Sequence, residues 1–226
     1  MMKAITLLSG GLDSTLCTVL ALRDMEVILA LTVDYGQKAR TREVESAGRI
    51  AAFYNIPHRV VEAGFLRTFA SGLTRAERST RSSREVWVPN RNGLFINIAA
   101  CYAEEMGAEA VLVGFNREEA VDFPDNSPDF VSAVNRSLSY STRNQVRVIS
   151  YTMEMDKTEM LREAIRLGIP LHYTWSCYED GPSPCGVCAS CRLLAKAREN
   201  LDLRATDEHR PGTQLKSLIS SERFRD

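Results

Sequence analysis

The sequence predicts an α/β domain, with helices on both faces of a parallel sheet, followed by a small helical segment built around four cysteines. Apolar runs alternate along the chain with stretches whose apolar residues recur at helical spacing. The runs themselves do not alternate between apolar and polar residues, which is typical of parallel strands buried on both faces. The cysteines cluster within 177–191. A chain of 226 residues accommodates one such domain and one small appendage.

The first half of the chain predicts three strands and two helices. A short apolar run at 3–8 leads through Ser-Gly-Gly into a stretch at 12–23 with apolar residues at helical spacing. The next run, 26–33, is almost continuously apolar and predicts a buried strand. Residues 40–54 place their apolar side chains on one helical face, and 57–62 predicts the third strand.

The second half continues the alternation of strands and helices. Residues 94–106 predict a helix, and the short apolar run at 110–113 predicts a strand that ends at a glycine. A helix at 131–138, a strand at 146–150 and a helix at 158–167 complete the pattern. Strands that alternate with helices predict crossover connections and therefore a parallel sheet.

Two segments depart from this pattern. Residues 67–84 contain five arginines among many serines and threonines, and predict a surface loop. This loop is either a solvated connector or a lid over an anionic substrate. Residues 204–226 are polar and nearly balanced in charge, and predict a loosely packed tail. We therefore expect an α/β domain at 1–170, a cysteine-containing segment at 171–203 and the tail.

Charge and hydropathy exclude several classes of protein. With 28 basic and 29 acidic residues the net charge is −1, so we expect no nucleic-acid partner for the bulk surface. No window approaches the roughly 20 apolar residues of a membrane span, so we expect no membrane association. The N-terminal apolar stretch is too short for a secretion signal. A cytoplasmic location is therefore expected, where clustered cysteines indicate metal or redox chemistry more often than disulfides.

The turn after the first predicted strand indicates an anion site. Gly10 and Gly11 allow a tight turn and a close approach of the backbone to a ligand. The free N–H groups of the helix that follows point toward the same place, and Ser9, Ser14 and Thr15 add hydroxyl donors. Neither the Walker pattern nor the dinucleotide-binding glycine pattern is present here. The alternative interpretation is a strand–turn–helix whose glycines serve only the turn.

The four clustered cysteines predict a metal site. Cys-x-x-Cys-x-x-Cys brings three sulfurs to one side of a turn, and a fourth reaches across a loop rich in glycine and proline. Four thiolates suit a closed, tetrahedral structural Zn²⁺ site with no open position for catalysis. An iron–sulfur cluster and redox-active thiols are the alternatives. The four residues are Cys177, Cys185, Cys188 and Cys191. Cys17 and Cys101 lie on predicted helices, and we expect both in the core.

Several motifs, in order along the chain, resemble those of one protein family. Ser-Gly-Gly-Leu-Asp-Ser at 9–14 resembles the signature loop of the PP-loop ATP pyrophosphatases. Asp-Tyr-Gly-Gln at 34–37, Val-Pro-Asn-Arg-Asn at 88–92, Lys157 and the cysteine pattern resemble one branch, the 7-cyano-7-deazaguanine synthases. The resemblance extends to about residue 204. It implies a Rossmann-like sheet of the adenine nucleotide alpha-hydrolase type, and a homodimer.

The resemblance also implies an activity. The family uses ATP and ammonia to convert 7-carboxy-7-deazaguanine to its nitrile, with Mg²⁺ at the phosphates and a structural Zn²⁺. In this sequence the ATP-binding loop then comprises Leu8, Ser9, Gly10, Gly11, Leu12, Asp13, Ser14, Thr15, Leu16, Cys17 and Thr18. The Zn²⁺ ligands are the four clustered cysteines. Such chemistry needs polyphosphate binding and cations rather than a protein nucleophile.

Roles for individual residues follow from the resemblance. Asp13 orients Mg²⁺ or caps the helix, and Lys157 neutralises charge on the β- and γ-phosphates unless it is an exposed lysine at a helix start. Arg91 forms a bidentate pair with the substrate carboxylate or the α-phosphate, or else a salt bridge within its loop. Asp122 or Asp125 accepts hydrogen bonds from the deazaguanine ring, or else serves a turn or a helix cap.

The segment after the fourth predicted strand departs from the family pattern. Many members carry Tyr-Pro-Asp-Cys-Arg, whereas Pro-Asp is followed here by Asn126 and Ser127. This looks like a subgroup variant. Two other functions remain alternatives: a PP-loop enzyme that modifies tRNA and a non-catalytic ATP-binding module. The arginines of 67–84 are the local feature that favours the first.

Overall fold

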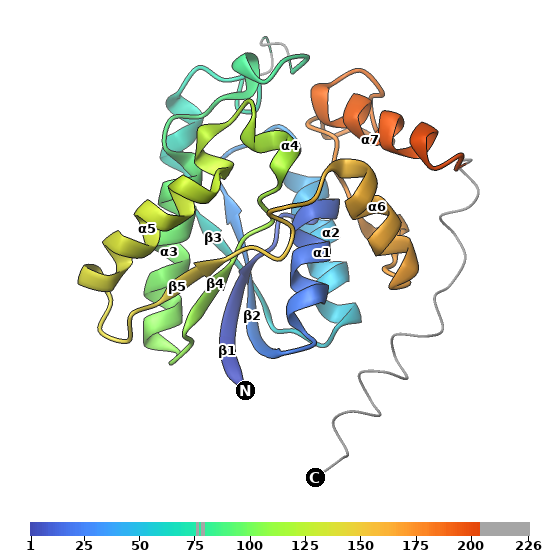
Figure 1. The fold of residues 1–226 in the computed structure, drawn as a ribbon. Helices are drawn as coiled ribbons and strands as arrows, with labels where there is room; N and C mark the ends of the chain where they lie inside the picture. The colour runs from blue at the N-terminus through green and yellow to red at the C-terminus, as the bar shows by residue number, and fades with distance from the viewer. Residues whose placement is uncertain (76, 78–79, 204–226) are drawn as a thin grey trace.

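A single parallel sheet organises the computed structural model, which describes residues 1–75, 77 and 80–203. Five strands lie in the order β3-β2-β1-β4-β5, and every neighbouring pair is parallel (Figure 1). The strands are β1 (Met2–Leu7), β2 (Met25–Asp34), β3 (His58–Glu62), β4 (Ala110–Leu112) and β5 (Arg147–Ile149). The predicted parallel α/β sheet is confirmed. The predicted tail at 204–226 lies outside the described residues.

Helices cover both faces of the sheet and create two apolar cores. One face packs against α1 (Leu12–Ala21), α2 (Arg40–Phe53) and α6 (Lys157–Arg166). The other face packs against α3 (Arg91–Glu105) and α5 (Pro128–Ser141). A doubly covered sheet explains why the central strands are apolar at nearly every position, since both of their faces are buried.

Most predicted elements are found within a few residues of their expected ends. The helix expected at 94–106 starts earlier, at Arg91, because Asn90 takes a left-handed conformation with φ of 54° and turns the chain into the helix. A short helix, α4 (Arg117–Ala120), was not predicted. It starts where the Asn116 side chain accepts a hydrogen bond from the backbone N–H of Glu119.

The C-terminal part of the described chain is a loop followed by α7 (Ala189–Asn200), which packs against α6 (Figure 1). The helix begins directly after Cys188, whose side chain caps it by accepting a bond from the N–H of Cys191. The predicted helical segment with its cysteines is therefore present. Trp175 precedes the cysteines, and its backbone N–H donates to the carbonyl of Gly10 at 2.8 Å. This bond holds the segment against the turn after β1.

The described part of the predicted loop at 67–84 is only partly solvated. Leu73 is buried in a third apolar cluster, together with Val86 and Val88. Thr80 accepts a bond from the N–H of Ala189 and donates through its hydroxyl to Glu179 at 3.2 Å. This segment, with its short 3₁₀ helices η1 (Gly64–Thr68) and η2 (Arg84–Val86), therefore connects the sheet to the cysteine-containing segment.

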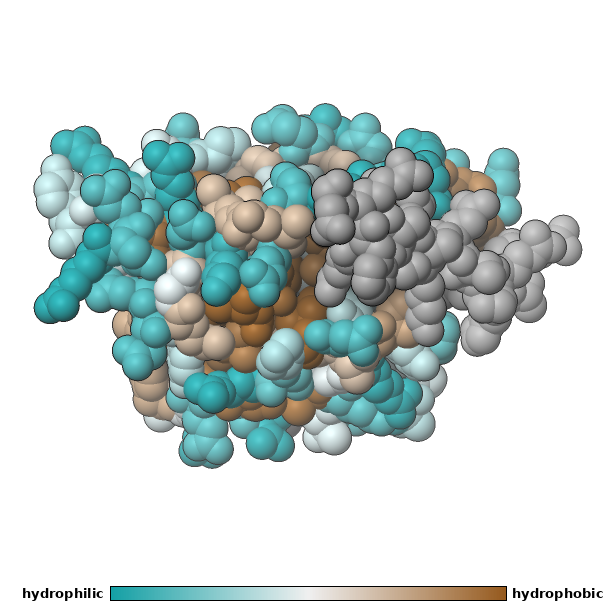
Figure 2. Space-filling model, turned by 90° about the horizontal axis from the view of Figure 1, so that it is seen from below, coloured by the Kyte–Doolittle hydropathy of each residue, from teal (hydrophilic) through white to brown (hydrophobic). Residues whose placement is uncertain are grey.

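The two ends of the sheet differ in character. The carboxyl ends of the strands are covered by α4, the 175–178 segment and the residues around Leu73. Figure 2 views the amino ends, where polar side chains surround an area of apolar residues. Among the helices described in this structure, none combines the length and the apolar composition that crossing a membrane requires.

Candidate functional site

A pocket opens at the carboxyl ends of β1, β2 and β4, the place where open α/β sheets bind ligands. The turn after β1 and the start of α1 form one wall. The start of α3, the residues around α4 and the start of α6 form others, and the 175–178 segment closes over them. The polar and charged residues that line the pocket include Ser9, Asp13, Ser14, Glu43, Arg91, Asn92, Glu119, Asn126, Lys157 and Ser176.

The turn after β1 depends on glycine at two places. Gly10 has a φ of 82°, and a Cβ there would lie 2.7 Å from the Cβ of Ser46 and 2.8 Å from the N of Ala47. A Cβ on Gly114, which follows β4, would lie 2.5 Å from the backbone N of Ser14. Gly10 therefore lets α2 pack directly against the turn, and Gly114 lets the segment after β4 pack against the start of α1.

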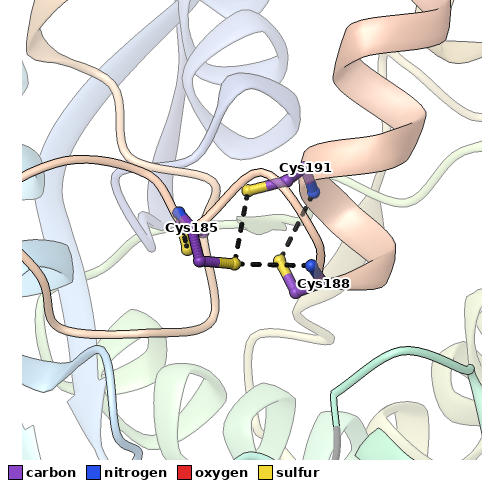
Figure 3. Close-up of side chains that lie close together, drawn as sticks. Cys185, Cys188 and Cys191 are labelled. Carbon is purple, nitrogen blue, oxygen red and sulfur yellow. Dashed lines mark hydrogen bonds between the residues drawn. The ribbon is translucent and has the colours of Figure 1, made fainter.

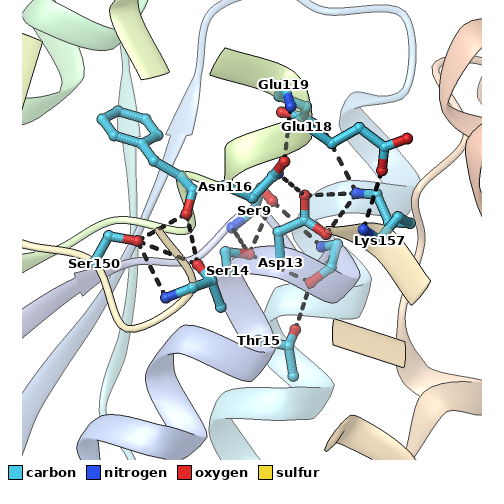
Figure 4. A network of polar contacts seen from close by, with 12 residues as sticks. Ser9, Asp13, Ser14, Thr15, Asn116, Glu118, Glu119, Ser150 and Lys157 are labelled. Atoms are coloured by element: carbon cyan, nitrogen blue, oxygen red, sulfur yellow. Dashed lines mark hydrogen bonds and ion pairs between the residues drawn. The ribbon is translucent and has the colours of Figure 1, made fainter. Parts of the chain in front are cut away.

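The start of α1 is suited to bind an anion. Gly11 occupies its N-cap and supplies no side chain, so the first N–H groups of the helix are left for a ligand. The hydroxyls of Ser9 and Ser14 lie 3.0 Å apart beside them. The Ser9 N–H donates to Ser14 Oγ at 3.2 Å, which holds the turn closed (Figure 4). The turn therefore has the geometry that the predicted anion site requires.

Asp13 and Lys157 form an ion pair inside the pocket, although 144 residues separate them (Figure 4). Lys157 Nζ lies 2.7 Å from Oδ1 and 2.6 Å from Oδ2 of Asp13, and 3.5 Å from Oε1 of Glu119. The amide of Asn116 donates to Asp13 Oδ2 at 3.0 Å. The Lys157 side chain is 8% exposed, so the interpretation of an exposed helix-start lysine is wrong.

Local structure holds this cluster in place. Asp156 and Glu159 form a capping box at the start of α6, which fixes Lys157 as the first helical residue. The N–H of Lys157 donates to Glu118 at 3.0 Å. Burial raises the pKa of Glu119, and the ammonium of Lys157 opposes that rise. The attraction of Asp13 and Glu119 raises the pKa of Lys157 despite its burial, so this lysine stays charged.

Arg91 faces the same pocket from the start of α3. Its guanidinium carbon lies 5.9 Å from the ring centroid of Tyr35, and its Nε donates to Asn92 at 3.3 Å. Burial raises the pKa of Tyr35 to about 12, so the phenol is neutral at physiological pH. Burial also raises the pKa of Asp125, which the nearby Arg91 opposes. The charge of Arg91 thus acts on Asp125, although Asp125 itself is not among the residues of the pocket wall, so its contact with the substrate, which the resemblance implies, stays a prediction.

Some of the predicted residues do not face the pocket. Thr15 donates its hydroxyl to the Gly11 carbonyl at 2.7 Å, and Thr18 bonds Thr6 in the core. Leu16 and Cys17 are buried in the core under α1. Cys101, by contrast, is exposed, so the expectation of a core position is wrong for that cysteine. Asp122 is exposed and is not part of the pocket wall.

Other residues of the pocket wall were not singled out from the sequence. Glu43 comes from the first turn of α2, Glu119 from α4, and Trp175, Ser176 and Tyr178 from the segment before the cysteines. A signal for the tyrosine was its place beside Cys177. For Glu43, the signal was a carboxylate shortly after the Asp-Tyr-Gly-Gln motif at the end of a strand.

The four cysteines lie together near the start of α7, and Figure 3 shows three of them, Cys185, Cys188 and Cys191. Their sulfurs all lie within 4.8 Å of one another, and those of Cys185 and Cys191 are 4.0 Å apart. Backbone N–H groups donate to three of the sulfurs. Two bonds reach Cys177, from Glu179 at 3.4 Å and Cys185 at 3.3 Å. Such bonds stabilise thiolates, which are the form of cysteine that binds metal.

The spacing of the sulfurs fits one tetrahedral metal ion. A Zn–S bond of about 2.3 Å separates neighbouring sulfurs of a tetrahedron by about 3.8 Å. An iron–sulfur cluster distributes four thiolates over two or more irons, so that some of the sulfurs lie further apart. Two of the four cysteines, Cys177 and Cys188, are buried. The donor set thus suits a closed, structural site.

Comparison with known proteins places the chain in a family. The family described as "Queuosine biosynthesis protein QueC" matches residues 3–202. A 7-cyano-7-deazaguanine synthase from Desulforudis audaxviator is 51% identical over 88% of this chain and 97% of the relative. Another, from Carboxydothermus hydrogenoformans, is 47% identical over 88% of this chain and 99% of the relative.

A solved structure shares the fold at low identity. It is described as a predicted subunit of tRNA methyltransferase from Methanocaldococcus jannaschii, with a TM-score of 0.51, 14% identity and coverage of 95% of both chains. At that identity the likeness concerns the fold alone. The match over residues 3–202, which include the turn after β1, Lys157 and all four cysteines, is the closer relationship. The chain belongs to the QueC family of queuosine biosynthesis proteins.

Proposed function

We propose that the protein is an ATP-dependent ligase that converts 7-carboxy-7-deazaguanine and ammonia to 7-cyano-7-deazaguanine. Relatives with the name of that synthase, at 51% and 47% identity, support the proposal. The observation that carries it is the convergence of the uncapped start of α1, Lys157 and Arg91 in one pocket. An amide-rich helix start and two cations are the groups that a polyphosphate beside a carboxylate requires.

The chemistry explains why ATP is needed. A carboxylate resists nucleophilic attack because it is anionic and lacks a good leaving group. Transfer of AMP from ATP to a carboxylate oxygen releases pyrophosphate and supplies that leaving group. Ammonia then displaces AMP to give the amide. A second ATP transfers AMP to the amide oxygen and releases another pyrophosphate. AMP then leaves with that oxygen as the nitrogen loses its two protons and the C≡N bond forms.

The protein's own groups would bind and orient the reactants. The N–H groups at the start of α1 and the hydroxyls of Ser9 and Ser14 would hold the phosphates of ATP. Lys157 would offset the charge that develops as pyrophosphate leaves. Asp13 would hold Mg²⁺, which shields phosphate charge when bound. Because Lys157 holds both oxygens of Asp13, nucleotide binding would exchange part of that ion pair for contacts to phosphate and metal.

Arg91 would position the acid substrate. A guanidinium pairs with a carboxylate or an α-phosphate through two parallel hydrogen bonds, which fixes their relative orientation. Its position in the pocket wall, near the ring of Tyr35, supports this role.

The cysteine-containing segment would act as a structural part. We assign residues 1–170 to ATP binding and residues 171–203 to a Zn²⁺-binding segment that closes over the pocket through Trp175 and Tyr178. We further propose a cytoplasmic homodimer that acts on small molecules. A bound Zn²⁺ would stabilise the cysteine-containing segment, which has little apolar core of its own.

One assay tests the proposal. The protein is incubated with ATP, Mg²⁺, ammonium and 7-carboxy-7-deazaguanine, and nitrile and AMP are measured by mass spectrometry. The proposal expects both products, and expects neither when the acid or ammonium is omitted. ADP and phosphate in place of AMP, or ATP binding without turnover, would contradict it.

Elemental analysis tests the metal assignment separately. It should find about one zinc per chain, and a protein with iron and a visible absorbance band would overturn the Zn²⁺ assignment.

A further inference from the structure

Three carboxylates line the pocket, and their surroundings differ. Both oxygens of Asp13 are held by Lys157, and Asn116 adds a further bond. Glu119 faces Lys157 at 3.5 Å. Glu43 receives a single bond of 2.7 Å from the neutral side-chain amide of Gln37 to its Oε2. Within residues 1–75, 77 and 80–203, no cation pairs with Glu43, so this carboxylate remains available to a ligand.

The motif after β2 holds Glu43 in a defined orientation. Gln37 accepts the N–H of Tyr35 through its Oε1 at 2.9 Å, so its NH₂ group must face Glu43. Gly36, with a φ of 78°, forms the tight turn that brings Gln37 back, and the N–H of Gly36 bonds Asp34 at 3.0 Å. The Asp-Tyr-Gly-Gln motif is thus a scaffold that fixes the carboxylate of Glu43 at the pocket wall.

Glu43 also lies beside the site of the reaction. A Cβ on Gly10 would come within 2.8 Å of the Glu43 carbonyl, so the residue adjoins the turn that would bind phosphate. The charge of Arg91 acts on Glu43, and that of Glu43 acts on Tyr35. A flat heterocycle held at Glu43 would therefore lie near the ring of Tyr35, with its 7-carboxylate within the region of Arg91 and the phosphates.

We propose that Glu43 is the specificity-determining residue for the deazaguanine ring, and that it accepts the adjacent N1–H and 2-amino hydrogens of the substrate on its two carboxylate oxygens. This inference rests on the proposed function. A deazaguanine presents two neighbouring donors on that edge, which match a carboxylate. The adenine of ATP presents a single amino donor on its corresponding edge, so it is the poorer match.

The electrostatic surroundings add a pH dependence. Burial raises the pKa of Glu43 to about 7, and the nearby carboxylates Asp180 and Asp34 add to the rise. The bond from Gln37 and the charge of Arg91 act in the opposite direction. The ionised form accepts both donors, whereas the protonated form has lost one acceptor. Recognition of the ring should therefore weaken as the pH falls below about 7.

The test is Glu43→Gln in the full-length protein, with Glu45→Gln as the matched control. Glu45 lies on the same helix, is exposed, and pairs with Arg49 outside the pocket. Steady-state kinetics are measured with 7-carboxy-7-deazaguanine and with an analogue that lacks the 2-amino group. Isothermal titration calorimetry with 7-cyano-7-deazaguanine in the absence of ATP measures the Kd of the nitrile, which does not depend on turnover.

For E43Q we expect the KM of the acid and the Kd of the nitrile to rise about 10-fold to 100-fold, since a hydrogen bond to a charged group is lost. The KM of ATP should change less than about twofold. The wild type should prefer the substrate with the 2-amino group by a similar factor, and E43Q should lose most of this preference. E45Q should match the wild type. Preference is a ratio within one preparation, so it holds even if part of the variant is unfolded.

The pH profile provides a second discriminating measurement. In the wild type, kcat/KM for the acid should fall about tenfold per unit below about pH 7, and E43Q should be flat over that range. Unchanged analogue preference in E43Q, or a rise confined to the KM of ATP, would overturn the inference. A wild-type protein that forms no nitrile would instead overturn the proposed function, so the two failures are distinguishable.

Discussion

The two ends of the pocket are built in different ways. At the proposed phosphate end, residues 9–14 with Lys157, the groups that line the pocket are backbone N–H groups at a helix start, two hydroxyls and one buried ammonium. At the proposed substrate end, the groups are the side chains of Glu43 from α2, Tyr35 from the turn after β2 and Arg91 from α3. Backbone groups bind any polyphosphate, whereas side chains in a fixed arrangement distinguish one ring from another.

We infer from this difference that specificity for the acid substrate resides in the side chains of the substrate end. The phosphate end depends on glycines and a helix terminus, features that a short motif encodes completely. The substrate end depends on a tight turn after β2 that orients Gln37 and Glu43, together with the left-handed Asn90 that starts α3. We therefore expect substitutions at the phosphate end to reduce turnover and those at the substrate end to reduce affinity for the acid.

The largest effect should come from Lys157→Met, which breaks the phosphate end. We expect kcat for nitrile formation to fall about 10²-fold to 10³-fold, because a preorganised cation at the departing pyrophosphate is lost. The variant should also be less stable by about 1–3 kcal/mol, since the partly exposed Asp13 would lose its cation and keep only the bond from Asn116. Product analysis and denaturant unfolding measure the two effects.

A double variant separates these two causes. Asp13→Asn combined with Lys157→Met removes the unpaired charge, so stability should recover while turnover should not. Recovery of turnover in the double variant would show that the lysine acts only through stability.

Cys188→Ser should affect both ends at once, because the segment that carries the cysteines also supplies Trp175 and Tyr178 to the pocket wall. We expect the metal content to fall from about one ion per chain to near zero and the melting temperature to drop by about 10 °C. Elemental analysis and calorimetry measure these changes. Cys101→Ser is the matched control, since Cys101 is exposed and lies outside the cluster. Retention of the metal by the Cys188 variant would contradict the four-thiolate site.

Arg91→Lys should weaken the substrate end selectively. A lysine keeps the charge but cannot form two parallel hydrogen bonds, so the KM of the acid should rise about tenfold or more. The KM of ATP should change by less than about threefold if the carboxylate is the partner of Arg91. An equal rise in both KM values would instead assign Arg91 to the α-phosphate, and kinetics with each substrate varied in turn decides between them.

The smallest effect should come from Asp122→Asn. Asp122 is exposed and lies outside the pocket wall, so every kinetic constant should stay within about twofold of the wild type. Asp125→Asn should give a larger effect, because Asp125 is partly buried beside Arg91. If kcat/KM for the acid fell strongly in the Asp122 variant, the acid would bind closer to α4 than the position of Glu43 implies.

The sequence by itself determined the features that depend on neighbouring residues. The alternation of apolar runs and helical stretches predicted the parallel sheet, because a strand that is buried on both faces is apolar at consecutive positions. The turn at 9–14 and the spacing of the four cysteines each lie within a short stretch of chain, so their chemistry was readable before any contact was known.

Only the tertiary structure decided which distant residues meet. The pairing of Asp13 with Lys157 joins positions 144 residues apart, and no local pattern in either place encodes the other. The packing of α2 beside the turn after β1 decided that Glu43 faces the pocket, while Asp122 was left on the surface. The physical reason is that burial and charge pairing depend on three-dimensional neighbours, which the parallel sheet assembles at its carboxyl edge from several crossovers.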